Sequence, residues 1–382
     1  MTSQERLKTA LDHREPDRVP LDLGSTPVTG IVTVAYRNYC RYQGLPYPEP
    51  EIQDVKQQLA RPHPDFLADL EVDTRPIARG RMGLGQQTFE RDGDYEFYYD
   101  EWDLGWRRPV PDGLYFDLFD HVLRDYTLDQ LKAWKFIDPL ADWRYAGMVE
   151  EAARLSAEGY GLVLGGVCAG VWEMALWLRG YDQFLFDMAA EPELADWLIG
   201  HMVDLKLAYW EKALGLIGDQ VTVCNEADDL GAQHALMVSP NMYRTLVKPH
   251  QKRLFSGIKA LAPHVKLFYH SDGAIYEVLP DLVELGVDIL NPVQVNAAGM
   301  GDTAKLKREF GDALTFWGAA CDSQDVLPHG TPQQVADEVK RRIDDLAPGG
   351  GYVFAGVHNI QADVPPENLD AFWTTFREEA GY

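Results

Sequence analysis

The sequence predicts an α/β protein whose core is a (β/α)8 TIM barrel, with an N-terminal extension and an inserted aromatic β-hairpin. Short apolar runs alternate with longer segments in which apolar residues recur at helical spacing, a pattern typical of right-handed βαβ units and a parallel sheet. Eight such runs occur in the 382 residues, which favours a closed barrel. An open doubly wound sheet is the alternative, but no G-x-G-x-x-G motif follows an early strand. We expect residues 1–382 to form one domain.

The predicted elements begin with a helix over residues 2–12, in which Leu7, Ala10 and Leu11 fall on one side. Eight strands are then expected, with the barrel helices between them. The predicted strands are residues 18–24, 72–78, 161–167, 220–225, 265–270, 287–292, 314–319 and 351–356. Among the helices, residues 331–346 show the clearest helical spacing of apolar residues.

The region around 86–110 differs from the rest of the chain because it is rich in both aromatic and charged residues. It contains the turn sequence Asp-Gly-Asp within an alternating pattern, which predicts an antiparallel hairpin set on the barrel. Exposed aromatic residues usually mark an interface. The hairpin is therefore expected to form either a lid over the barrel or the contact surface of a homodimer.

Composition and charge exclude several classes of protein. The chain has 60 acidic and 35 basic residues and a formal net charge of −25, so we expect neither nucleic acid nor a membrane as a partner. Its four cysteines include no Cys-x-x-Cys pair, which argues against a disulfide framework. The N-terminus lacks the apolar segment of a signal peptide, and no apolar run approaches the ~18 residues of a membrane span. We therefore expect a cytoplasmic protein.

Polar side chains gather where the predicted strands end, and barrel enzymes carry their chemistry at the carboxyl ends of their strands. His270 and Asp272 follow one strand, and His358 follows the last. The other polar residues at strand ends are Asn225, Glu226, Asp228, Asp229, Gln294, Cys321 and Asp322. Imidazoles, carboxylates and a thiol at one mouth form a ligand set for Zn²⁺, although no sequential motif such as HExxH is present.

Several of these residues have a second interpretation. Asp272 is a metal ligand, a general base or a turn residue, since Asp-Gly is also a common turn pair. Asp228 and Asp229 are adjacent and point in different directions, so we expect one to face the pocket and the other to cap a turn. Cys321 is either part of the pocket wall or a small buried thiol.

Several blocks of sequence occur in an order that spans almost the whole chain. They include ERLKTALDHREPDRVPLDLG at the start, ADDLG (227–231), FYHSDGAI (268–275), ELGVDILNPVQ (284–294) and GGGYVFAGVHNIQADVPPENL (349–369). These blocks resemble the uroporphyrinogen decarboxylase superfamily. The resemblance implies a (β/α)8 barrel, in agreement with the strand count.

That superfamily has two main branches. True uroporphyrinogen decarboxylases hold substrate carboxylates with an arginine-rich segment near the N-terminus, and the corresponding DRVPLDLGSTPVTG has no such cluster. Porphyrinogen decarboxylation is therefore not expected. The other branch comprises zinc-dependent methyltransferases that work with corrinoid proteins. Its coenzyme M members bind zinc through a His-x-Cys pair and a later Cys, where this chain has His270-x-Asp272 and His358.

The exchange of thiolates for a carboxylate and an imidazole makes the implied site harder and more Lewis acidic, which suits a substrate oxygen better than a thiol. The resemblance thus implies a zinc-dependent methyltransferase of the O-demethylase kind. It would take a methyl group from a small methoxylated or methylated compound and pass it to cob(I)alamin. The corrinoid must arrive on a separate corrinoid protein, because this chain has no Asp-x-His-x-x-Gly motif.

The resemblance also implies roles for individual residues. Zinc is expected on His270, His358 and one or two of Asp272, Glu226 and Asp228. The expected catalytic residues are Asp228, Asp229 and Asp272. The expected substrate-pocket residues are Asn225, Gln294, Cys321 and Asp322.

Two alternatives stay open at this point. In the first, the barrel is a metal-independent decarboxylase or lyase of a small carboxylic acid. His270 and Asp272 are then an acid–base pair, and Arg244, Lys248 and Arg75 are the candidate carboxylate anchors. In the second, the barrel is a non-enzymatic binding or scaffold component, and loss of the His270 imidazole leaves its biological role intact.

Overall fold

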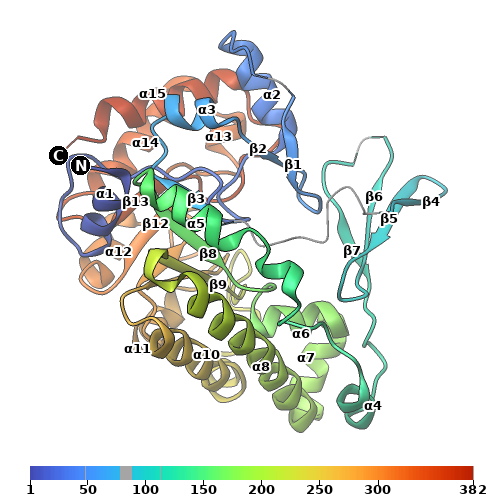
Figure 1. The fold of residues 1–382 in the computed structure, drawn as a ribbon. Coiled ribbons are helices and arrows are strands. Elements are labelled where there is room, and N and C mark those ends of the chain that lie inside the picture. The colour runs from blue at the N-terminus through green and yellow to red at the C-terminus, as the bar shows by residue number, and fades with distance from the viewer. Residues whose placement is uncertain (48, 78–87, 112, 382) are drawn as a thin grey trace.

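The computed structural model describes residues 1–47, 49–77, 88–111 and 113–381, and its centre is a curled seven-stranded parallel sheet (Figure 1). The strand order is β13-β12-β11-β10-β9-β8-β3. The strands are β3 (Thr74–Pro76), β8 (Gly161–Gly165), β9 (Val223–Ala227), β10 (Lys266–His270), β11 (Ile289–Asn291), β12 (Thr315–Ala319) and β13 (Tyr352–Ala355). Because every neighbouring pair is parallel, the carboxyl ends of all seven lie at one end of the sheet. This confirms the predicted fold class.

The predicted first strand, residues 18–24, lies between the two edge strands of this sheet. Leu21 forms a parallel bridge with Phe354 of β13, and the Asp22 N–H donates to the Phe354 carbonyl at 2.9 Å. On the other side the Asp73 N–H, next to β3, donates to the Leu21 carbonyl at 2.9 Å. The segment therefore closes the sheet, but through single bridges rather than a regular strand. Residue 78 of the predicted second strand lies outside the described residues.

The N-terminal helix α1 (Ser3–Leu11) fills the amino end of the barrel. A capping box between Thr2 and Glu5 starts it, as each side chain accepts a hydrogen bond from the backbone N–H of the other. Leu7 and Leu11 pack in one cluster with side chains from the strands, namely Val163, Val223, Phe268, Ile289, Trp317, Val353 and Ala355. Helix α1 thus occupies the amino end of the barrel, and the cavity described below opens at the carboxyl end.

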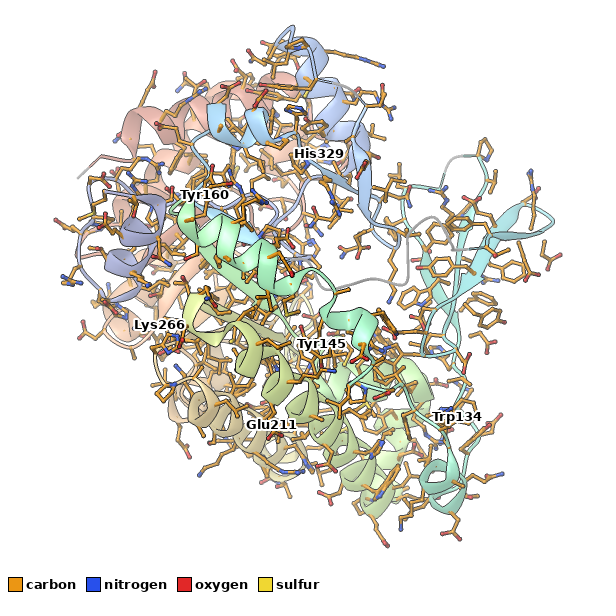
Figure 2. All side chains as sticks on the ribbon, in the orientation of Figure 1. Trp134, Tyr145, Tyr160, Glu211, Lys266 and His329 are labelled. Atoms are coloured by element: carbon orange, nitrogen blue, oxygen red, sulfur yellow. The ribbon has the colours of Figure 1, made fainter. Side chains whose placement is uncertain are left out.

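Helices cover the outside of the sheet, and side chains fill the space between the two layers (Figure 2). Helices α8 (Pro192–Ile217) and α10 (Lys248–Leu261) lie side by side (Figure 1). The predicted helix over 331–346 is α14 (Pro332–Leu346), and Thr331 caps its first turn. Among the described residues, no helix combines the length and hydrophobicity that a membrane span needs.

The remaining helices and turns complete the outer layer. The helices are α2 (Thr33–Tyr42), α3 (Pro64–Asp69), α4 (Leu128–Ala133), α5 (Met148–Ala157), α6 (Val171–Arg179), α7 (Tyr181–Ala190), α9 (Pro240–Met242), α11 (Leu279–Glu284), α12 (Thr303–Phe310), α13 (Val326–His329) and α15 (Pro366–Glu379). The short 3₁₀ turns are η2 (Asp142–Tyr145), η3 (Gly218–Gln220) and η5 (Tyr276–Val278), and a π turn, η4 (Tyr243–Val247), precedes α10.

The aromatic insert is larger than the predicted hairpin and stands beside the barrel as a four-stranded antiparallel sheet (Figure 1). Its strands are β4 (Glu90–Asp92), β5 (Tyr95–Tyr99), β6 (Gly105–Pro109) and β7 (Asp117–Asp120). The predicted turn is present, because Gly93 has a φ of +55° between β4 and β5. Residues 86 and 87 of the predicted region lie outside the described residues. A second, two-stranded sheet consists of β1 (Glu51–Asp54) and β2 (Leu59–Arg61).

Candidate metal centre

Three side chains converge at the carboxyl end of the barrel. His270 ends β10, Asp272 follows it by two residues, and His358 lies in the loop after β13. One potential ligand atom from each of the three lies within 4.8 Å of the others. His270 Nε2 and His358 Nε2 are each 3.9 Å from Asp272 Oδ2. We call this group the His-Asp-His cluster.

The orientation of the His270 ring is fixed by Asn291, the last residue of the neighbouring strand β11. The Asn291 Nδ2 group donates to the Trp317 carbonyl at 2.7 Å, which places Asn291 Oδ1 toward the ring. That oxygen lies 2.6 Å from His270 Nδ1 and only accepts, so Nδ1 carries the hydrogen. The lone pair of neutral His270 is therefore on Nε2, the nitrogen that faces Asp272.

The cluster fits a zinc ion by the chemistry of its donors. Two imidazole nitrogens and one carboxylate oxygen are ligands that Zn²⁺ accepts, and three protein ligands are typical of catalytic zinc sites. Burial lowers the pKa of His358, which favours the neutral form that a metal requires. His270 Nδ1 donates a hydrogen bond to Asn291. Metal-binding histidines are typically oriented by such a bond from the ring nitrogen that does not bind the metal.

Asp229 lies beside the cluster and holds its loop in place. Asp229 Oδ1 accepts a hydrogen bond from the Asp272 N–H at 2.9 Å and is 3.6 Å from His270 Nε2. Burial raises the pKa of Asp229. Of the two adjacent aspartates, Asp229 is the one that faces the cavity described below.

Asp228 points the other way and caps helix α6, which differs from its predicted catalytic or ligand role. Its Oδ1 accepts from the N–H groups of Trp172 and Glu173 at 2.8 and 2.9 Å, and its Oδ2 accepts from Gln251 Nε2 at 2.9 Å. A carboxylate at a helix N-terminus satisfies N–H groups that have no partner within the helix. The turn before α6 requires Gly170, where a Cβ would lie 1.7 Å from the Ala227 carbonyl oxygen.

Glu226 also lies outside the His-Asp-His cluster, which corrects its prediction as a zinc ligand. Its Oε2 forms a buried ion pair with Lys206 Nζ at 2.9 Å, and its Oε1 accepts from Trp210 Nε1 at 2.5 Å. Both partners come from α8. The side chain of Glu226 thus neutralises a buried lysine, and its exposed fraction is 3%.

The structure places the four predicted pocket residues in different environments. Asn225 lines the cavity. Gln294 lies just outside it and accepts a hydrogen bond from the Gly273 N–H, which supports the loop that carries Asp272. Cys321 is a buried thiol directed at Glu338 of α14, and Asp322 accepts hydrogen bonds from the N–H groups of the next turn. The last two are therefore corrected to structural positions.

A cavity of about 800 Å³ opens beside the cluster, and both histidines line it. Much of its lining is aromatic, and most of these aromatic residues come from the insert. The aromatic lining residues include Tyr98, Trp102, Trp106, Phe116, Trp143 and Trp177. Lys56 Nζ lies 3.9 Å from the centre of the Trp106 ring and 3.3 Å from Asp100 Oδ2. The insert thus supplies one wall of the cavity, as expected of a lid, while the homodimer stays a prediction.

The carboxylate anchors considered for a lyase are not in this cavity. Arg244 and Lys248 both pair with Asp281 of α11. Arg75 donates to the carbonyls of Val72 and Thr74 and lies over the Tyr160 ring.

One cavity residue, Glu173, was missed by the sequence reasoning. It lies on helix α6. The other candidates were chosen because they follow the carboxyl ends of strands, and Glu173 does not. The only signal in the sequence is its place early in the helix that follows β8.

Comparisons with known proteins agree with this fold. The family model of uroporphyrinogen decarboxylase (URO-D) matches residues 120–379. A uroporphyrinogen decarboxylase from Pseudoalteromonas translucida is 25% identical over 291 residues, which cover 70% of this chain and 75% of that protein. Another from Psychromonas ingrahamii is 23% identical over 248 residues, which cover 62% of this chain and 64% of that protein.

Among solved structures, a methyltransferase from Methanosarcina mazei superposes with a TM-score of 0.64 and 17% identity, and the match covers 99% of each chain. At that identity the likeness shows a shared fold. The family model, in contrast, covers well over half of the sequence. This chain belongs to the uroporphyrinogen decarboxylase (URO-D) family.

Proposed function

We propose that this protein is a zinc-dependent methyltransferase that demethylates a small methoxylated or methylated compound and passes the methyl group to the cob(I)alamin of a separate corrinoid protein. The observation that carries the proposal is the His-Asp-His cluster, whose ligand atoms converge at the carboxyl end of the barrel. The cluster lies at the wall of a cavity large enough for a small organic molecule.

The proposed metal site uses His270, Asp272 and His358. A zinc ion bound there would act as a Lewis acid on the substrate heteroatom whose methyl group leaves. An ether oxygen is a poor leaving group, so stabilisation of its developing negative charge is a physical requirement of the reaction.

Other residues of the chain prepare this site. Asn291 keeps the hydrogen of His270 on Nδ1 and so directs Nε2 toward the cluster. Asp229 accepts the Asp272 N–H, and Gln294 accepts the Gly273 N–H. Two neighbouring strand ends thus hold the loop of Asp272 from both sides, which reduces the reorganisation needed when ligand binds.

The aromatic wall is suited to hold the apolar body of the substrate and to exclude water. Trp106 packs edge-on against Trp177, with ring centres 5.3 Å apart, so the wall joins the insert to helix α6. The methyl acceptor is expected on a partner protein. The name of the M. mazei structure of the same fold, a methyltransferase, supports methyl transfer as the reaction class.

The test is a methyl-transfer assay with zinc-loaded protein, a reduced corrinoid protein and a panel of methoxylated and N-methylated compounds. We expect at least one compound to convert cob(I)alamin to methylcobalamin, which is followed by absorbance. His270→Ala should abolish the conversion, and His264→Ala, at an exposed histidine before β10, should not. No methylcobalamin from any compound in the panel would refute the proposal.

A further inference from the structure

Glu173 is a cavity carboxyl for which the proposed reaction has no role so far. It lies in the first turn of α6, and it lines the same cavity as Asp229, His270 and His358. Its side chain is half-buried. Within the described part of the chain, no lysine, arginine or histidine forms an ion pair with it.

The backbone at the start of α6 holds Glu173, whose carboxyl also accepts a hydrogen bond from the Gly170 N–H. Its N–H donates to Asp228 Oδ1 at 2.9 Å, and the same oxygen accepts from Trp172. Asp228 is itself held by Gln251. Gly170, at the start of α6, packs so closely against Ala227, at the end of β9, that no Cβ fits between them. The buried network around Asp228 therefore fixes the start of the helix and, with it, the place of the Glu173 carboxyl at the cavity wall.

The charges that face Glu173 are mainly negative. Asp228 and Asp229 come from the end of β9, and Asp272 comes from the loop after β10. Tyr181 of α7 is also near enough to interact with it electrostatically, and the histidines of the cluster share its cavity. Burial, followed by the charges of Asp229 and Asp228, raises the pKa of Glu173 well above its ordinary value. Burial and these neighbouring carboxylates thus favour the protonated form of the Glu173 carboxyl.

We propose that Glu173 is the general acid of this site and delivers a proton to the substrate heteroatom as its methyl group leaves. This inference rests on the proposed methyl transfer. In the step, the electron pair of Co(I) on the partner forms the new bond to the methyl carbon. The pair of the broken carbon–oxygen bond stays on oxygen, which takes the proton from Glu173. The product is an alcohol or phenol, and solvent returns a proton to the Glu173 carboxylate.

The first experiment uses two anisoles of similar shape, 4-methylanisole and 4-nitroanisole. The nitrophenolate leaves readily without a proton, whereas the methylphenolate needs one. We expect Glu173→Gln to slow demethylation of 4-methylanisole by about 10²–10⁴-fold and to affect 4-nitroanisole far less. Glu173→Asp should recover part of the lost rate, and Glu211→Gln, on the exposed face of α8 (Figure 2), should match the wild type. Equal slowing of both anisoles, or slowing of neither, would overturn the proposal.

A second measurement does not depend on turnover, so it separates failure of this inference from failure of the proposed function. Infrared difference spectra of the wild type and Glu173→Gln, recorded at neutral pH with and without zinc, report protonated carboxyl groups directly. We expect a carboxylic acid C=O band that Glu173→Gln removes and Glu211→Gln retains. If that band is absent, Glu173 is ionised and is not the acid. If no compound is demethylated by the wild type, methyl transfer fails, and the acid role fails with it even where the band is present.

Discussion

Asn291 accepts a hydrogen bond from His270 Nδ1 while its own amide group donates to the Trp317 carbonyl, so three neighbouring strands, β10, β11 and β12, determine which nitrogen of His270 faces the cluster. Outer contacts of this kind typically change metal affinity about 10–100-fold when they are lost.

Replacing the amide should therefore weaken metal binding without removing a ligand. We expect Asn291→Ala to reduce zinc affinity by about 10–100-fold, measured by competition with a chromophoric chelator. Asn291→Asp, which keeps an acceptor for His270 Nδ1, should retain more affinity than Asn291→Ala. Unchanged affinity in Asn291→Ala would show that the tautomer is set elsewhere.

The turn before α6 offers a test of the fold around the site. At Gly170 a Cβ would lie 1.7 Å from the Ala227 carbonyl oxygen and 1.9 Å from Asp228 Oδ1. We expect Gly170→Ala to lower the free energy of unfolding by about 1–3 kcal/mol or more, measured by urea denaturation. Gly215→Ala, in α8 with open space around it, should raise that free energy by up to about 1 kcal/mol. Equal effects at the two glycines would contradict the close approach.

The buried Lys206–Glu226 pair gives a prediction that separates stability from metal binding. Lys206→Met removes the cation of the buried ion pair with Glu226, so the free energy of unfolding should fall by about 3–5 kcal/mol. The double variant Lys206→Met/Glu226→Leu should recover most of the loss. Glu226→Gln should retain the zinc content of the wild type, because Glu226 is not in the cluster. Loss of zinc in that variant would return Glu226 to the ligand set.

The raised pKa of Asp228 predicts that the free energy of unfolding depends on pH. Burial raises its pKa to about 6, so the native state keeps a proton that the unfolded chain has released between about pH 4 and 6. The unfolding free energy contributed by this group therefore falls as pH rises through that window. Relative to Asp228→Asn, the wild type should lose about 1–3 kcal/mol from pH 4 to pH 7. A difference between the two proteins that does not vary with pH would contradict this account.

The sequence predicts much of this fold because its determinants are local. Apolar runs mark the parallel strands, and the helix over 331–346 carries its own capping residue. The segment 18–24 pairs only through single bridges, and its apolar pattern alone does not show that difference. That Leu7 and Leu11 fill the amino end of the barrel depends on long-range packing, which periodicity does not report.

The site could be predicted only in part. The expectation that site residues follow the carboxyl ends of strands brings His270, Asp272 and His358 together, because parallel strands end at one face. It cannot separate Asp228 from Asp229, since the direction of each side chain depends on α6. It also cannot foresee the pairing of Glu226 with a lysine 20 residues earlier on α8. Glu173 is missed because a helix, not a strand, presents it.

The most direct test of the central claim is the zinc content of untagged protein, measured by elemental analysis after reconstitution. Wild type is compared with His270→Ala, His358→Ala and the exposed control His264→Ala. We expect about one zinc per chain in the wild type and the control, and loss of that zinc in both cluster variants. A wild type that takes up no zinc, or cluster variants that keep it, would contradict the assignment of a metal to these residues.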